Sequence, residues 1–149
     1  MEKVRVMFLC AGNSCRSQMA EGWARELAGD WLEIKSAGID AYGQNESAIK
    51  VMAEVGIDIS QQHSIRVNGE MLEWCDLIVT LCDYAEEQSS PMLSTHTLKM
   101  HMPLPDPVKF SGNEQELMTE FRATREKIKQ CVEYMITQLL EQQLVVNGY

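Results

Sequence analysis

The sequence predicts an α/β fold with a parallel sheet flanked by helices. Short apolar runs suited to strands alternate along the chain with amphipathic stretches at helical spacing. Such alternation is typical of right-handed crossovers between parallel strands, which leave helices on both faces of the sheet. The length of 149 residues suffices for one hydrophobic core, so we expect a single domain over residues 1–149.

The first half of the chain divides into two strand–helix pairs. Strands are expected at residues 4–9 and 32–37, and helices at residues 18–27 and 46–55. In the first helix Glu21 and Glu26 lie off most of the apolar face. The buried face predicted for this helix consists of Met19, Ala20, Trp23, Ala24, Leu27 and Ala28. The stripe predicted for the second helix consists of Ala48, Val51, Met52 and Val55.

The second half begins with a short helical turn, expected at residues 70–74, and a third strand at 77–81. Residues 83–94 are polar and we expect a loop there. A fourth strand is expected at residues 97–102. The proline-rich segment 103–107 predicts a rigid loop that forms neither helix nor sheet ladder. A long amphipathic helix should run from residue 113 or 114 to about 144. Its predicted buried face consists of Leu117, Phe121, Ile128, Val132, Met135, Ile136 and Leu139.

Composition and charge exclude several classes of protein. The chain is 45% hydrophobic and 23% charged, as in ordinary globular proteins. Its net charge of −9 argues against nucleic-acid binding, which requires a basic face. No signal peptide is evident and no apolar run approaches the length of a membrane span. The five cysteines fit no small disulfide scaffold, so reduced thiols in the cytoplasm are expected.

The segment from Cys10 to Ser17 carries the clearest chemical signal, because it lies between a predicted strand and a predicted helix. A loop of this kind can direct several backbone N–H groups at one point, and the following helix adds the positive end of its dipole. The arrangement predicts a pocket for a tetrahedral oxyanion with a thiol at its floor. The residues expected to bind the oxyanion are Ala11, Gly12, Asn13, Ser14, Cys15 and Arg16.

Residue types in this loop fit nucleophilic catalysis. Inward N–H dipoles and a nearby arginine favour the thiolate of Cys10, which is the nucleophilic form. Arg16 offers a planar fork that can bind two oxygens of the anion, and Ser17 can donate a hydrogen bond to the thiolate. In the alternative interpretation Cys10 is merely a buried residue at a strand end. The strand before the loop and the helix after it favour the catalytic role.

Two further groups are expected at the same edge of the sheet. Cys82 and Asp106 each follow a predicted strand, as Cys10 does. Ligands of open parallel sheets bind at the carboxyl ends of the strands, so these three groups are predicted to share one rim.

The loop and the residues that follow it, Ser17-Gln-Met-Ala-Glu-Gly-Trp23, resemble the low-molecular-weight protein tyrosine phosphatase fold, and more narrowly the arsenate reductases built on it. The resemblance extends over nearly the whole chain. It includes Ser36-Ala-Gly38, Val79-Thr-Leu-Cys82 and Asp106-Pro107. It implies a four-stranded parallel sheet and makes Asp106 the general acid that protonates the leaving oxygen. On the sequence alone, Asp106 would otherwise be read as a turn residue.

The residues after Asp106 bear on the substrate. Tyrosine phosphatases of this fold usually carry aromatic residues directly after the Asp-Pro pair, whereas this chain continues Val108-Lys-Phe110. This favours a small inorganic oxyanion such as arsenate over phosphotyrosine, with phosphate or sulfate as competitors. The alternatives are a tyrosine or aryl-phosphate phosphatase acting through a cysteinyl phosphate, and a non-catalytic oxyanion-binding module. Residual phosphatase activity is expected even in a reductase.

Cys82 distinguishes a reductase from a phosphatase, because reduction of As(V) to As(III) takes two electrons and a phosphatase needs one thiol. The resemblance implies that Cys10 forms a thiol–arsenate adduct and that Cys82 then forms a disulfide with Cys10. Alternatively, Cys82 merely closes a strand. The electron donor would be thioredoxin or glutathione with glutaredoxin.

The third relay cysteine of the thioredoxin-coupled relatives is missing, since Ser89 or Ser90 stands in its place. Either the Cys10–Cys82 disulfide is reduced directly, a small thiol attacks the adduct, or Cys15 or Cys75 substitutes. We expect structural roles for Cys15, Cys75 and Cys131.

No bound cofactor or metal is predicted. Some relatives bind potassium through residues that match Asn13, Glu21 and Ser36, but Ile65 stands where a further carboxylate is expected. A monomer is expected.

Overall fold

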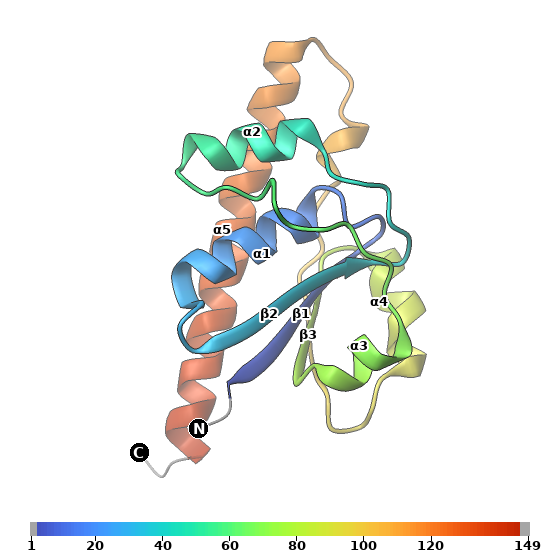
Figure 1. The fold of residues 1–149 in the computed structure, drawn as a ribbon, viewed down its shortest axis with the longest axis vertical. Helices are drawn as coiled ribbons and strands as arrows, with labels where there is room; N and C mark the ends of the chain where they lie inside the picture. The colour runs from blue at the N-terminus through green and yellow to red at the C-terminus, as the bar shows by residue number, and fades with distance from the viewer. Residues whose placement is uncertain (1–2, 147–149) are drawn as a thin grey trace.

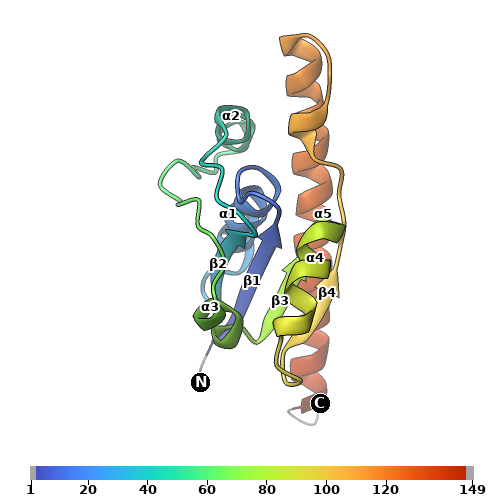
Figure 2. The ribbon, with the colours of Figure 1, turned by 90° about the vertical axis from the view of Figure 1, so that its right-hand side faces the viewer.

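One parallel sheet forms the centre of the structure, a computed structural model that describes residues 3–146, of which residues 143–146 are described by their backbone alone. Its strands lie in the order β2-β1-β3-β4 (Figures 1 and 2). Their bounds are β1 Val4–Cys10, β2 Leu32–Gly38, β3 Leu77–Thr80 and β4 Leu98–His101. All pairs are parallel. The predicted α/β fold with four parallel strands is therefore confirmed.

Helices cover both faces of this sheet. One face packs against α1 (Arg16–Ala28) and α5 (Glu114–Val146), and α2 (Glu46–Glu54) packs on these two helices in the same core. The other packs against α3 (Gly69–Trp74) and α4 (Asp83–Ser89). Figures 1 and 2 show α5 running the whole length of the molecule, past both ends of the sheet. Among the described residues, no helix is both long enough and apolar enough to cross a membrane.

Side chains of β1 alternate between the two cores, as expected for a strand buried on both faces. Val6, Phe8 and Cys10 belong to the core beneath α1 and α5, whereas Met7 and Leu9 belong to the core beneath α3 and α4. This alternation places the thiol of Cys10 on the α1 side of the sheet. It also brings Cys10 to the carboxyl end of the sheet, where β1 meets the start of α1.

The prediction of a loop over residues 83–94 is wrong, because α4 is followed there by a 3-10 turn, η1 (Ser90–Met92). The Cys82 sulfur accepts the Ala85 N–H and caps the helix, and Asp83 and Glu86 place negative charge in its first turn. Ala85 and Ser89, one turn apart, are the buried residues of the helix. Two small buried side chains in a polar stretch are too weak a signal for hydrophobic periodicity.

Smaller differences concern helix faces and the proline loop. Leu27 and Val55 are exposed although we expected them in the core, and Glu21 is buried although we expected it off the apolar face. Residues 103–107 are not wholly irregular, because Pro107 begins a 3-10 turn, η2 (Pro107–Lys109). A proline is compatible with this first helical position, where its missing N–H is not required.

Candidate active site

The loop between β1 and α1 packs closely against the segment that follows β2. The carbonyls of Cys10, Ala11 and Gly12 accept the N–H groups of residues 39, 40 and 42, respectively. In a trans peptide the N–H points opposite to the carbonyl, so the N–H groups that follow these three carbonyls point the other way, into the curl of the loop. The orientation suits an anion-binding loop at a helix start.

Gly38 makes this close packing possible. A Cβ on Gly38 would lie 2.2 Å from the Asp40 carbonyl oxygen and 2.6 Å from the Asn13 nitrogen, so a side chain has no room. Gly12 faces a different neighbour, because its Cβ would lie 2.0 Å from the ring of Tyr42. Tyr42 therefore packs on the loop while 71% of its surface stays exposed.

Asn13 holds the loop from inside, with a left-handed backbone (φ 48°) that asparagine tolerates better than most residues. Its Oδ1 accepts the Ile65 N–H at 2.8 Å, and this fixes the orientation of the amide because a backbone N–H can only donate. Its Nδ2 then donates to Ser17 Oγ at 2.7 Å and to Ser36 Oγ at 3.0 Å. One buried amide thus orients two hydroxyl groups.

Ser17 connects this amide to the thiol. Its Oγ lies 2.9 Å from Cys10 Sγ, and both groups are buried. Ser17 Oγ accepts from Asn13, so its own proton is available to donate to the Cys10 thiolate. A hydroxyl proton directed at sulfur stabilises the thiolate form of Cys10. The predicted proximity of Cys10 and Ser17 is found.

Ser36 carries the second branch of the network. Its hydroxyl donates to Glu21 Oε1 at 2.5 Å, and Arg25 Nη2 lies 2.6 Å from Glu21 Oε2. The Glu21 carboxylate and the Asn13 amide oxygen thus accept from donors within the network.

Arg16 begins α1 and turns its side chain toward the loop that follows β4. Its Nη1 donates to the Leu104 carbonyl at 2.9 Å, and its Nη2 lies 3.5 Å from Asp106 Oδ2. Asp106 also accepts the Val108 N–H on Oδ1 at 3.1 Å, which caps η2. The guanidinium and the carboxyl group are thus held together at the mouth of the loop, as their positions after β1 and β4 predict.

Cys82 follows β3, the strand next to β1. Leu9 pairs with Thr80, and the Leu81 N–H donates to the Leu9 carbonyl at 2.9 Å, so Cys82 lies one residue beyond the last paired positions. It is half-buried and packs against both cores. Cys82 and Cys10 therefore follow the ends of adjacent parallel strands.

Burial raises the pKa of each of the three remaining cysteines. Burial raises the pKa of Cys15 to about 12, and burial raises the pKa of Cys75 to about 11. Cys75 precedes β3 and Cys82 follows it, so the two thiols lie at opposite ends of this strand. Cys131 lies on α5, where burial also raises its pKa. At neutral pH these thiols stay protonated, which suits structural roles and not a relay.

Comparison with known proteins agrees with the geometry of the site. Residues 5–145 match the family described as low molecular weight phosphotyrosine protein phosphatase. The chain belongs to this phosphatase family. Within the family it falls among the arsenate reductases: it is 46% identical to the arsenate reductase of Bacillus subtilis (strain 168), over 86% of this chain and 91% of that protein.

Solved structures agree with this place in the phosphatase family. An arsenate reductase in its phosphate-binding state gives a TM-score of 0.75 at 34% identity, over 91% of this chain and 98% of that one. An arsenate reductase in its oxidised state gives a TM-score of 0.75 at 33% identity, over 90% and 97% of the two chains. The four-stranded sheet and the loop after β1 are thus those of an arsenate reductase fold.

Sequence reasoning missed three contributors to this family site. Tyr42 packs on Gly12, the Leu104 carbonyl binds Arg16, and Arg25 binds Glu21. Tyr42 and Leu104 reach the site from loops, and no spacing in the sequence indicates such contacts. Arg25 lies four residues after Glu21 on a helix, and this spacing in the sequence indicates an ion pair.

Proposed function

We propose that this protein reduces arsenate to arsenite through an adduct on Cys10 and a disulfide between Cys10 and Cys82. The observation that carries the proposal is the position of two thiols at the carboxyl ends of adjacent parallel strands: Cys10 ends β1 at the anion loop, and Cys82 follows β3. Similarity to arsenate reductases in sequence and in structure supports the proposal. A phosphatase mechanism has no use for the second thiol.

In the first step the Cys10 thiolate attacks arsenic and an As–O bond breaks. Arg16 and the loop N–H groups bind the remaining oxygens. Asp106, when protonated, gives its proton to the leaving oxygen, which departs as water. Its place beside Arg16 at the mouth of the loop supports this role. The product is a Cys10–S–As(V) adduct, and no electrons have yet been transferred to arsenic.

In the second step the Cys82 thiolate attacks the Cys10 sulfur. The S–As bond breaks and its electron pair stays on arsenic, so As(V) becomes As(III) and leaves as arsenite. A Cys10–Cys82 disulfide remains, and two thiols have supplied the two electrons. The sulfur atoms must approach to about 2 Å, which neighbouring strand ends permit.

An external thiol then restores the enzyme. Thioredoxin, or glutathione with glutaredoxin, is the proposed donor, because Ser89 takes the place of a third cysteine and its Oγ donates to the Ala85 carbonyl instead. We place the protein in the cytoplasm as a single-domain monomer. All five cysteines are free thiols, which fits a reducing compartment.

The test is a thiol count after a single turnover. Fully reduced protein is mixed with arsenate in the absence of reductant, and the remaining thiols are mapped by mass spectrometry. Loss of two thiols with a Cys10–Cys82 link is expected, and C131A should behave identically. A link from Cys82 to Cys15 or Cys75 would replace the proposed pair by another relay. Unchanged thiols with no arsenite formed would refute the proposal.

Aryl-phosphate hydrolysis is a second candidate activity, favoured by the exposed ring of Tyr42 against Gly12 at the loop. A phenyl group entering with its phosphate can pack on this ring. Hydrolysis of p-nitrophenyl phosphate by wild type, and its loss in C10S but not in C82S, is expected. Equal rates in C10S and wild type would remove this activity from the site.

A further inference from the structure

His101, the last residue of β4, forms a bridge between the two segments that flank Cys82. Its Nδ1 lies 2.7 Å from Thr80 Oγ1, two residues before Cys82, and its Nε2 lies 2.9 Å from Asp83 Oδ1, directly after Cys82. We propose that His101 is a positioning residue that holds the backbone of Cys82 in place for attack on Cys10. This inference rests on the function proposed above.

The bridge adds a side-chain link across the junction between β3 and α4, beyond the backbone hydrogen bonds that hold Leu81 to Leu9 and Leu104. β3 ends at Thr80 and α4 begins at Asp83, so Cys82 lies between two elements. Because His101 binds the end of the strand and the start of the helix, it fixes the direction in which α4 leaves the sheet. The hydrogen bond that the Cys82 sulfur accepts from the Ala85 N–H at 3.4 Å follows from that direction.

The far end of α4 is tied to the same strand. Lys99 Nζ donates to Ser90 Oγ at 3.0 Å, and Ser90 follows the last residue of α4. Lys99 and His101 are two residues apart on β4, so both side chains extend from the same face of the strand. The edge strand therefore holds both ends of the helix that begins next to Cys82.

Both hydrogen bonds of the bridge are available to either charge state of His101. A neutral ring with its proton on Nε2 donates to Asp83 and accepts the Thr80 hydroxyl on Nδ1. A charged ring donates from both nitrogens, and the Thr80 hydroxyl proton turns to the Met100 carbonyl, 3.4 Å from Thr80 Oγ1. The positioning role therefore requires no particular protonation state.

The two chemical steps should therefore depend on different residues. Formation of the Cys10 adduct depends on Arg16, Ser17 and the loop, none of which His101 contacts. Attack by Cys82 depends on where the junction places its sulfur. Small displacements of a reacting group are enough to slow a reaction between oriented groups substantially. Loss of the bridge should therefore slow the disulfide step alone.

The experiment compares H101N and H101Q in the full-length protein. An Asn amide can replace the Nδ1 contact to Thr80 but does not reach Asp83. A Gln amide can reach Asp83, and the parallel pairing of residue 101 with Thr80 still holds the strand end of the bridge. After arsenate addition, we expect disulfide formation to slow about tenfold in H101N and to stay within about twofold of wild type in H101Q. The rate of Cys10 alkylation and the dissociation constant of phosphate, measured on the same proteins, should not change.

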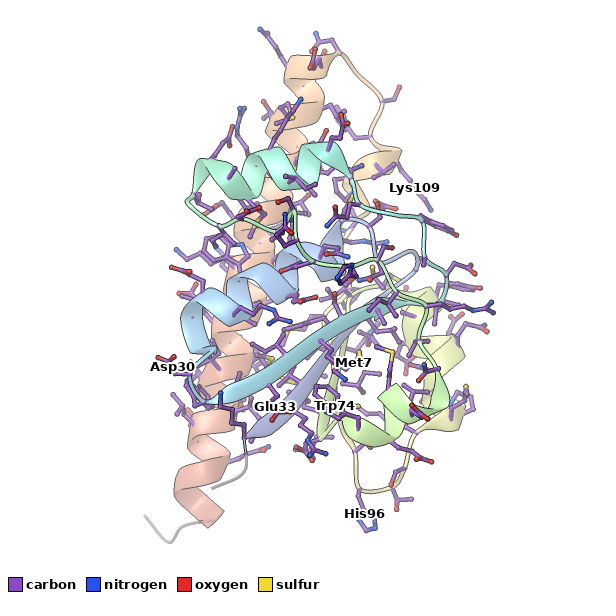
Figure 3. The ribbon with its side chains drawn as sticks, in the orientation of Figure 1. Met7, Asp30, Glu33, Trp74, His96 and Lys109 are labelled. Carbon is purple, nitrogen blue, oxygen red and sulfur yellow. The ribbon has the colours of Figure 1, made fainter. Side chains whose placement is uncertain are left out.

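The control is H96N. His96 precedes β4, and Figure 3 shows it at the bottom of the molecule, far from Lys109 in the loop that follows β4. D83A tests the bridge from the helix side and should match H101N, and the double variant D83A/H101N should be no slower than either single variant.

The positioning role of His101 and the proposed function would be refuted by different results. Wild-type disulfide rates in both H101N and D83A would overturn the positioning role, as would equal slowing in H101N and H101Q. Slower Cys10 alkylation in H101N would show a general disturbance of the site and would also overturn it. Absence of a Cys10–Cys82 disulfide in wild type would instead refute the proposed function itself.

Discussion

Arg16 and Asp106 face each other at the mouth of the anion loop, with Nη2 and Oδ2 3.5 Å apart. The arginine that should bind the substrate oxyanion is therefore already paired with a carboxylate. An entering anion competes with Asp106 for the guanidinium. Proximity to Arg16 also keeps the proposed acid within reach of an oxygen bound there.

D106N should separate binding from catalysis. Removal of the carboxylate removes a competitor for Arg16 and a negative charge from the mouth, so phosphate should bind more tightly. Loss of the proton donor should lower turnover by at least about a hundredfold. Titration with phosphate and single-turnover arsenate reduction measure the two effects. Weaker phosphate binding in D106N would show that the ion pair does not compete with the anion.

S17A should reduce the reactivity of Cys10 at neutral pH. The variant removes the hydroxyl proton directed at the sulfur, and hydrogen bonds to charged groups contribute about 1.5 kcal/mol or more, which corresponds to roughly a tenfold loss of thiolate. The rate of Cys10 alkylation by iodoacetamide at pH 7 reports this loss. S60A, at an exposed turn before Gln61, is the control. An unchanged alkylation rate in S17A would mean that the serine only packs.

G38A should damage the loop, whereas G69A should not. A Cβ on Gly38 would overlap the backbone at Asp40 and Asn13, so the loop must shift and the free energy of unfolding should fall by about 2 kcal/mol or more. Gly69 begins α3 with open space around it and serves as the matched control. Urea unfolding and phosphate binding test both. A G38A protein that binds phosphate normally would contradict the close packing.

Stability should decline at alkaline pH because of two buried thiols. The pKa of Cys15 is raised from 9.0 to about 12 and that of Cys75 from 9.0 to about 11. Above pH 9 the unfolded chain releases these protons while the folded chain keeps them, so the stability present below pH 9 is lost progressively up to pH 11–12. Urea midpoints at pH 8 and pH 10.5 should differ less in C75A than in wild type. An equal difference in both proteins would contradict this.

The sequence was sufficient for the strands and for the loop between β1 and α1, because β1 is apolar from Val6 to Leu9 and the apolar residues of α1 recur at helical spacing. It was insufficient for α4, where the cap is a cysteine sulfur and the buried residues are Ala85 and Ser89. Predicted site residues meet because parallel strands end at one edge. Contacts that depend on loop paths, such as Tyr42 on Gly12, have no counterpart in sequence spacing.

Burial of Glu21 shows why the network could not be predicted in full. A glutamate in an amphipathic helix is normally solvent-exposed, and here it is buried with Ser36 and Arg25 as partners. The partner serine comes from β2, and only the tertiary fold brings that strand beside α1. The pattern of a single helix contains no information about this neighbour.

The side-chain amide of Asn13 also limits the routes by which protons can reach Cys10. The amide nitrogen of Asn13 donates to both Ser17 and Ser36 and cannot accept a proton from either, so it interrupts proton transfer between Glu21 and Cys10 along this network. The thiolate is stabilised from its buried side while remaining cut off from the carboxylate behind it. Every proton that reaches the reaction must then enter from the open side of the pocket, where Asp106 lies.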